Sequence, residues 1–365
     1  MIVIVVIAGA LYACMFLYLS KHQGLKSQQI DVNLAGVNSF SLIIPATDED
    51  DNLPYLIESL VQQNYDINLF EIIVVLDNPT KNLKDTCAKL ANDNVAVTEN
   101  ILGKGKKKAL LTGIESAKNN FIIQLDADCS VQLGFLLAYD QFIRTKNVDL
   151  IIGIVLPAVH NSDSILSKMF ALEHISLLST QFNLALISKP SLASGANMLY
   201  RKDKFMIIKD EWLAIPTDSG DDVFMVQLFK KRNYKILIND FDEAIVKTGL
   251  PENLSEFINQ RVRWGAKTKY YKDSFLKFLA LIVVFQNLII VSLFVLILFR
   301  KYSPADFAMV FFLKVLIDYF YLRPYLFRFD KKFLANNFLL ASAAYPFYLI
   351  FTSTKANFGN TNWKN

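Results

Sequence analysis

Two carboxylates stand one residue apart after an apolar stretch near the middle of the chain. The segment FIIQLDADCS runs from Phe121 to Ser130 and carries Asp126 and Asp128. An apolar run predicts a buried strand, which would hold both side chains rigidly at its C-terminal end. Carboxylate oxygens suit Mg²⁺ or Mn²⁺, ions that usually keep substrate phosphates among their ligands. The motif predicts a metal and pyrophosphate site, but a lone D-x-D is also common in solvated turns and helix caps.

Carboxylates also follow the first two predicted strands. PATDEDDNL places Asp48 and Glu49 beyond Pro45, and EIIVVLD ends in Asp77. The carboxyl ends of parallel strands share one edge of a sheet, where acidic groups can accept hydrogen bonds from a ribose or base. Turn formation and helix capping explain any one of these sites alone. They explain the set of three less well, so the sequence favours a nucleotide site.

Two further segments carry charged groups at predicted helix starts. LGKGKKKAL places Lys104 between two glycines, an arrangement that suits a phosphate. The same lysines could form a solvated basic surface or meet lipid headgroups. SGDDVF places Asp221 and Asp222 before a helix, where a carboxylate can act as a general base or as a helix cap.

The segment NQRVRW lies shortly before an apolar run. It supplies Gln260, Arg261, Arg263 and Trp264. Guanidinium groups bind phosphate oxygens in pairs, and an indole ring can stack on a sugar. Arginine and tryptophan are equally common as anchors at a membrane surface, so this segment alone leaves both interpretations open.

Alternating strands and helices would position these side chains. From about residue 39 to residue 245, short β-rich runs alternate with longer amphipathic stretches, which predicts a mostly parallel α/β sheet with crossover helices. The expected strands are 41–46, 71–77, 95–98, 121–125, 150–155 and 234–238. The expected helices are 53–63, 82–92, 106–118 and 164–178.

The two ends of the 365-residue chain are apolar and predict membrane segments. Residues 2–20 lack charged side chains and are long enough to span a bilayer. Because Lys21, His22 and Lys26 follow, the positive-inside rule places the next domain in the cytoplasm. Residues 278–299 form a second uncharged run.

The remaining C-terminal segments are less uniform. Residues 305–322 carry Lys314 and Asp318 four apart, as expected for an ion pair that clasps two helices. Residues 333–351 predict a third membrane segment or a re-entrant or interfacial hairpin, because Pro346 and two asparagines interrupt them. The net charge of +4 does not predict nucleic-acid binding, and the three isolated cysteines do not predict disulfides.

In combination and order, these motifs resemble the membrane-bound members of glycosyltransferase family 2, which include cellulose, chitin, hyaluronan and glucosylceramide synthases. The resemblance covers about residues 41–267 and implies a GT-A nucleotide-sugar-binding, Rossmann-like domain flanked by transmembrane helices. LDAD resembles the D-x-D motif, with Asp128 as the main metal ligand and Asp126 nearer the nucleotide. GDD resembles the motif that supplies the base, which implies Asp222 as catalytic residue with Asp221 beside it.

The resemblance extends to the other segments. QRVRW is similar to Q-x-x-R-W, which implies that Gln260, Arg263 and Trp264 close over the pyrophosphate and acceptor. SGANMLYR is similar to the acceptor-side segment and implicates Gly195. The first two motifs depart from the family pattern, because Thr47 precedes Asp48 and Asn78 follows Asp77. The nucleotide contacts are therefore less well defined than the metal site.

The expected protein is an integral membrane enzyme of the inner or plasma membrane, with Mg²⁺ or Mn²⁺ as cofactor. It would transfer a sugar, with inversion, from a nucleotide donor to a lipid or glycan acceptor. A processive polysaccharide synthase and a catalytically silent membrane scaffold are the alternatives. The expected domains are a transmembrane helix at 1–22, a cytoplasmic catalytic domain at 38–250, an interfacial segment at 251–275 and two or three membrane helices at 276–355.

Overall fold

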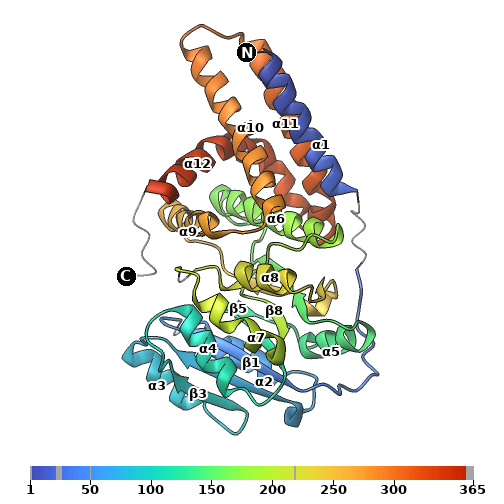
Figure 1. Cartoon of the computed structure of the whole chain (residues 1–365), viewed down its shortest axis with the longest axis vertical. Coiled ribbons are helices and arrows are strands. Elements are labelled where there is room, and N and C mark those ends of the chain that lie inside the picture. Colours follow the sequence, from blue (N-terminus) through green and yellow to red (C-terminus); the bar gives the residue numbers. More distant parts are fainter. Residues whose placement is uncertain (1, 22–26, 50, 218, 359–365) are drawn as a thin grey trace. The chain divides into compact units, whose positions relative to one another are not determined.

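A computed structural model describes most of the chain, namely residues 2–21, 27–49, 51–217 and 219–358. The chain divides into two compact units (Figure 1). The sheet unit comprises residues 26–158 and 190–249. The helical unit comprises residues 1–25, 159–189 and 250–365.

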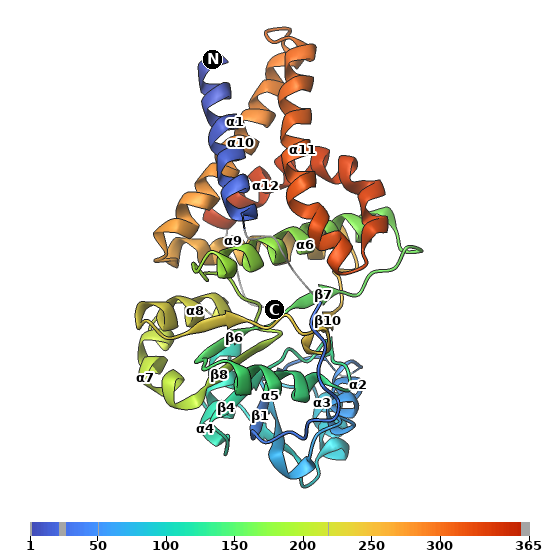
Figure 2. The same cartoon turned by 90° about the vertical axis from the view of Figure 1, so that its right-hand side faces the viewer.

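The sheet unit is built on short apolar runs whose side chains are buried on both faces, as expected for a parallel sheet covered by helices. Among the described residues, seven strands pair in the order β3-β2-β1-β4-β8-β6-β9. Figure 2 labels β1, β4, β8 and β6 of this sheet. Strand β1 pairs in parallel with β2 and β4, whereas β8 runs antiparallel to β4 and β6. The strands are β1 (Phe40–Ala46), β2 (Phe70–Leu76), β3 (Val95–Glu99), β4 (Phe121–Gln124), β6 (Leu150–Ile152), β8 (Met198–Arg201) and β9 (Ile236–Ile238).

The helices of the sheet unit follow apolar periodicity. The four buried residues of α2 (Leu53–Val61), for example, recur at helical spacing and face the sheet. The other helices are α3 (Lys81–Leu90), α4 (Lys106–Ser116), α5 (Phe135–Thr145), α7 (Lys202–Leu213) and α8 (Asp221–Lys231), with 3-10 turns η1 (Ile67–Leu69) and η2 (Asp242–Ala244).

A small second sheet lies in the same unit. Its strands are β5 (Cys129–Ser130), β10 (Val246–Thr248) and β7 (Val155–Pro157). The strand expected at residues 150–155 is therefore divided between two sheets. The chain turns at Gly153, where an added Cβ would lie 2.3 Å from the Asn197 side chain.

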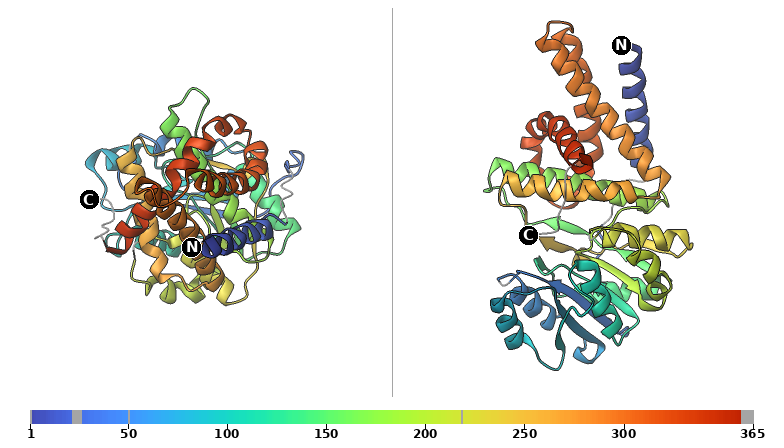
Figure 3. Two further views of the ribbon diagram at one scale, coloured as in Figure 1. Left: turned by 90° about the horizontal axis from the view of Figure 1, so that it is seen from above. Right: turned by 60° about the vertical axis from the view of Figure 1, so that its left-hand side comes forward.

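The helical unit contains the apolar segments. Val5 and Ala8 of α1 pack against Ile289 and Leu293 of α10. In Figure 3, α1 is the blue helix at the N-terminus and α10 is one of the orange helices. The helices are α1 (Ile2–Ser20), α6 (Ile165–Leu186), α9 (Leu254–Ala266), α10 (Ser274–Leu298), α11 (Pro304–Arg328) and α12 (Phe338–Phe358), with 3-10 turns η3 (Lys267–Tyr270) and η4 (Lys332–Asn337).

Three segments of the described chain are long and apolar enough to cross a membrane: Val3–Ser20, Ser274–Leu298 and Lys332–Asn357. Of the two alternatives expected for residues 333–351, the last of these agrees with the membrane segment and not with the hairpin, because α12 continues through Pro346 as one helix. His22 and Lys26, which carried the topology prediction together with Lys21, lie outside the described residues.

The unit boundary also differs from the expected catalytic domain at 38–250. Residues 159–189, which include α6, group with the helical unit. The physical reason is that α6 packs against α11, whose tyrosines hydrogen-bond to polar side chains of α6. For example, Tyr325 donates to Asn183 Oδ1 at 2.8 Å.

Candidate active site

Strand register brings the predicted acidic segments to one edge of the sheet. Ala46 at the end of β1 is paired with Leu76 of β2, and the Asp77 amide donates to the Ala46 carbonyl at 2.8 Å. On the other side of β1, Gln124 at the end of β4 pairs with Ile43. The three strands therefore present their carboxyl ends side by side, as expected for a ligand site of a parallel sheet.

Lys106, in the first turn of α4, lies at the centre of the acidic cluster. Its Nζ donates to Asp126 Oδ1 at 2.5 Å and lies 3.8 Å from Asp221 Oδ2. Burial lowers the pKa of the Lys106 ammonium group, but Asp126, Asp221 and Asp222 raise it by more. The net pKa is therefore above the usual lysine range, so Lys106 stays positively charged.

The cluster nevertheless holds more negative than positive groups. Burial raises the pKa of the Asp126 carboxyl above its usual value, Lys106 opposes this, and Asp128 and Asp222 add to it. A raised carboxylate pKa beside a lysine means that the site binds additional positive charge favourably. This donor set fits a hard divalent cation.

The metal fit depends on Asp128 and on the substrate. Asp128 is exposed, and its Oδ2 accepts a long 3.3 Å hydrogen bond from Thr248 of β10. Within the described part of the chain, no group of three or more His, Cys, Asp or Glu side chains could hold a metal ion. Two aspartates suffice when substrate phosphates complete the shell, which is the usual mode for Mg²⁺ and related ions.

The Asp221–Asp222 pair begins α8, where a helix N-terminus favours carboxylates. Gly220 precedes the pair at φ 90°, a left-handed conformation that suits glycine. Asp221 is buried and accepts from Gln124 Nε2 at 2.6 Å. Asp222 is half-buried, and its two oxygens accept from the amides of Val223 and Gly195. Asp222 is thus the more accessible of the two.

Gly195 allows these groups to approach one another. A Cβ at this position would lie 2.8 Å from both Asp221 Oδ2 and Gln124 Nε2, and 3.2 Å from Lys106 Nζ. Those atoms are themselves bonded within the cluster, so they have little freedom to move. The site therefore requires a residue without a side chain here.

Asp77 shapes the loop before α4. Its Oδ2 accepts from the Gly105 amide at 2.9 Å, and its Oδ1 accepts from Asn100 Nδ2 at 2.9 Å. Gly103 and Gly105 both have positive φ, which explains the two glycines of this loop. Lys104 between them is exposed.

The residues after β1 form a turn. Glu49 Oε2 accepts from the amides of Thr47 and Asp48, so it organises its own loop. Asp48 is exposed, and Pro45 is half-buried within β1, opposite Val75. The structure places these residues at the correct edge of the sheet.

The QRVRW residues belong to α9 of the helical unit. Arg261 is buried and donates from Nε to both oxygens of Glu173 in α6 at 2.9 Å. It also donates to Gln260 Oε1 and lies over the Trp264 ring, 4.2 Å from its centroid. Burial lowers the pKa of Arg263. Arg261, expected to bind the donor, is therefore used within the helical unit.

The sequence pattern indicated Lys104 but not three residues that contact the acidic cluster: Lys106, Gln124 and Trp212. A signal for Lys106 was present, because it lies four residues before buried Leu110 and so points inward on α4. Gln124 is the last residue of β4, one position before LDAD. Trp212 donates from Nε1 to the Asp221 carbonyl, a contact that sequence spacing does not show.

The chain is similar to known glycosyltransferases. Residues 41–207 match Glycosyl transferase family 2. An N-acetylglucosaminyltransferase of Neorhizobium galegae is 22% identical over 295 residues, covering 74% of this chain and 66% of the relative. Poly-beta-1,6-N-acetyl-D-glucosamine synthase of Staphylococcus aureus is 24% identical over 266 residues, covering 71% of this chain and 61% of the relative. This chain spans less than two thirds of either relative.

Structural similarity shows the fold. Mannosyltransferase PcManGT from Pyrobaculum calidifontis, solved in complex with GDP-Man and Mn²⁺, matches with a TM-score of 0.54 at 15% identity. The match covers 96% of this chain and 95% of that one. The expected α/β class with a GT-A, mostly parallel sheet is confirmed. The chain carries a glycosyltransferase family 2 domain, matched over residues 41–207.

Proposed function

We infer that this protein is a membrane-associated, inverting glycosyltransferase that moves a sugar from a nucleoside diphosphate donor to a hydroxyl group of a lipid or glycan. The observation that carries this function is the cluster of Asp126, Asp221 and Asp222 around Lys106 at the carboxyl edge of the sheet. Such a cluster suits a ligand that brings both a diphosphate and a divalent cation.

Asp222 is the proposed general base. It is half-buried, and the amides of Val223 and Gly195 fix its carboxylate. An aspartate with an ordinary pKa of about 3.9 is a weak base, so proton removal must accompany attack of the acceptor hydroxyl on the anomeric carbon. Asp221, buried against Gln124, holds the turn and contributes negative charge.

Asp128 and Asp126 are the proposed ligands of Mg²⁺ or Mn²⁺. When bound, the ion would offset the negative charge that builds on the departing diphosphate. Lys106 directs its own positive charge at Asp126, and it is therefore the protein cation best placed to assist. Lys104 remains a candidate only for the outer part of the donor, because it is exposed.

Pro45, Asp48, Glu49 and Asp77 are proposed to border the nucleoside, since they follow β1 and β2 at the same edge. In the helical unit, Gln260, Arg263 and Trp264 are proposed to contact the diphosphate and acceptor. Arg261 would support them through Glu173.

The proposed location is the plasma membrane, with the sheet unit in the cytoplasm. Three apolar helices support membrane association. UDP-GlcNAc is the first donor to test, because the two relatives named above are an N-acetylglucosaminyltransferase and a poly-N-acetylglucosamine synthase.

The test uses the full-length protein in lipid nanodiscs. Nucleoside diphosphate release is measured with UDP-GlcNAc, GDP-Man and other nucleotide sugars, with Mn²⁺, Mg²⁺ or EDTA, and with extracted lipids as acceptors. We expect one donor to give metal-dependent release and a glycosylated lipid or glycan by mass spectrometry. Absence of release with every donor would support a silent scaffold and reject the proposed function.

The base assignment has its own variant. Asp222→Asn keeps the size of the side chain and should lower transfer by about 10²- to 10⁴-fold while UDP affinity is retained. Asp85→Asn, at an exposed position on α3, is the matched control and should retain wild-type transfer. Wild-type transfer by Asp222→Asn would remove Asp222 from this role.

A processive synthase is the second candidate, favoured by the similarity to poly-beta-1,6-N-acetyl-D-glucosamine synthase. It predicts products of many lengths from one enzyme at low acceptor concentration. Products one sugar longer than the acceptor would support single transfer instead.

A further inference from the structure

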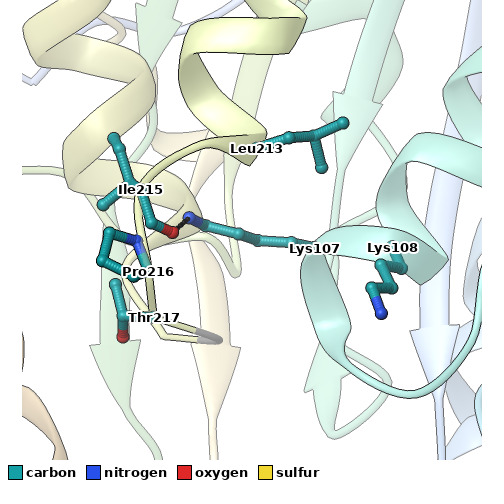
Figure 4. A pocket seen from close by; sticks show the side chains of 6 residues that line it. All are labelled: Lys107, Lys108, Leu213, Ile215, Pro216 and Thr217. Atoms are coloured by element: carbon teal, nitrogen blue, oxygen red, sulfur yellow. Dashed lines mark hydrogen bonds between the residues drawn. The ribbon is translucent and has the colours of Figure 1, made fainter.

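Lys107, next to the cluster lysine, is buried in α4 and has a different set of partners. Its side chain is 4% exposed. Nζ donates to the carbonyls of Trp212 and Ile215, each at 3.2 Å, and Figure 4 shows the side chain reaching the Ile215 segment. The ammonium group also lies 5.3 Å from the ring centroids of Trp212 and Phe224. A buried cation is costly to desolvate, so this location requires such compensation.

The two carbonyls lie where α7 ends. Trp212 is the penultimate residue of α7, and Ile215 follows the helix by two residues. The last carbonyls of a helix lack partners within the helix and carry the negative end of its dipole. The Lys107 ammonium group therefore acts as a cap from another helix and ties the end of α7 to the first turn of α4.

The end of α7 is coupled in turn to the acidic pair. Trp212 is fully buried, and its Nε1 donates to the Asp221 carbonyl at 2.9 Å. Asp221 opens α8 next to Asp222. The contacts thus run from Lys107 through Trp212 to Asp221. Lys106 provides a second link between α4 and Asp221, because it is next to Lys107 in the chain and its ammonium group faces the Asp221 carboxylate.

One side of the α7–α8 connection borders open space. A cavity of about 250 Å³ is lined by Lys107, Lys108, Leu213, Ile215, Pro216 and Thr217 (Figure 4). The Lys107 hydrogen bond to the Ile215 carbonyl therefore reaches main chain that lines this cavity.

We propose that Lys107 is a positioning residue that holds the Asp221–Asp222 turn in place through the main chain of Trp212 and Ile215. Its effect on the reaction rests on the proposed function of Asp222, but its effect on the turn does not. If only the packing of the lysine stem mattered, removing the charge while keeping the stem would not loosen the Asp221–Asp222 turn.

The first measurement is amide hydrogen exchange of the full-length protein, with thermal unfolding alongside. Lys107→Met keeps the length of the stem and removes the cation. We expect faster exchange confined to α7's last turn and the first turn of α8, with Lys107→Arg closer to wild type. Lys108→Met is the control, because Lys108 is exposed and borders the same cavity. Unchanged exchange, or faster exchange throughout the sheet unit, would overturn the proposal.

The second measurement is steady-state transfer with UDP-GlcNAc, or with the donor that the screen selects. Lys107→Met should lower kcat by about 10- to 100-fold with donor KM unchanged, since a small displacement of a catalytic group has effects of that size. In an Asp222→Asn background, Lys107→Met should cause little further loss, because both act on the same group.

Other outcomes separate this inference from the function on which it rests. Losses that multiply in the double variant would reject the positioning role and leave the Asp222 assignment intact. Local loosening of the turn in Lys107→Met, combined with wild-type transfer by Asp222→Asn, would reject the base and retain the structural part of the proposal. If Lys107→Met does not fold, Trp212→Phe removes the bond to the Asp221 carbonyl, keeps a smaller aromatic ring near Lys107, and should give the same local exchange pattern.

Discussion

Buried cations are arranged differently in the two units. In the sheet unit, Asp126, Asp221 and Asp222 all act on Lys106, and Asp128 acts on Asp126. In the helical unit, Arg261 is paired with Glu173, and Lys314 is paired with Asp318. The first arrangement has an excess of negative charge, whereas each of the other two is a balanced pair.

This difference separates a ligand site from structural contacts. In a balanced buried pair the two opposite charges neutralise each other, so the pair can fix the register of helices without a further ion. An acidic excess leaves positive charge to be supplied by a ligand, and strongly perturbed carboxylates are common at functional sites. Four variants can test whether this contrast is correct.

The largest effect is expected from breaking one balanced pair. Glu173→Ala leaves the Arg261 guanidinium buried without its carboxylate and should reduce the free energy of unfolding by about 3–5 kcal/mol. Thermal unfolding in detergent measures the change. Replacing both residues by Met should recover most of it. The exposed Glu211, paired with Lys231 and Arg232, is the control, and its Ala variant should leave the stability nearly unchanged because exposed ion pairs contribute little.

Adding a side chain inside the acidic cluster should lower the rate of transfer more than it lowers the free energy of unfolding. Gly195→Ala would press its Cβ against Asp221 and Gln124, so kcat should fall by about 10- to 100-fold with UDP affinity preserved. Gly249→Ala is the matched control, because an added Cβ there meets nothing within 4 Å. A wild-type rate for Gly195→Ala would mean that the cluster tolerates displacement.

A smaller effect is expected at the second balanced pair. Tyr12 of α1 donates to Asp318 Oδ1 at 2.6 Å and so joins α1 to α11. Tyr12→Phe should destabilise the helical unit by about 1 kcal/mol, as buried hydrogen bonds between membrane helices typically do. Tyr18→Phe, at an exposed position of the same helix, should not. Loss of transfer without loss of stability in Tyr12→Phe would contradict a purely structural role.

The smallest effect is a shift with pH. The Asp126 pKa is higher in the folded protein than in an unfolded chain, so the associated stabilisation is present at low pH and lost as pH rises through the folded pKa. Without divalent cations, the Tm of Asp126→Asn relative to that of wild type should therefore increase by about 2–4 °C as pH rises. Mn²⁺ should reverse this difference near neutral pH. An unchanged difference across the pH range would mean that the acidic excess is compensated elsewhere.

Local sequence patterns predicted the positions of several side chains because the strands themselves are local. The apolar runs before Asp77 and Asp126 are β2 and β4. Both pair in parallel with β1, and this register places their carboxyl ends at the same edge of the sheet. The sequence pattern indicated Lys104 as a phosphate-binding candidate, whereas the lysine at the centre of the acidic cluster is Lys106. The direction of a side chain depends on where α4 begins, and the helix begins at Lys106, after two glycines with positive φ.

The amino-acid sequence by itself determined the strand ends, the acidic motifs and the apolar helices, because each depends on neighbours a few residues away. Only the tertiary structure decided that Lys106 joins Asp126 to Asp221, and that Arg261 is held by Glu173. These contacts join residues that are 20, 115 and 88 positions apart. Charge pairing at such separations depends on how the elements pack, which no local pattern encodes.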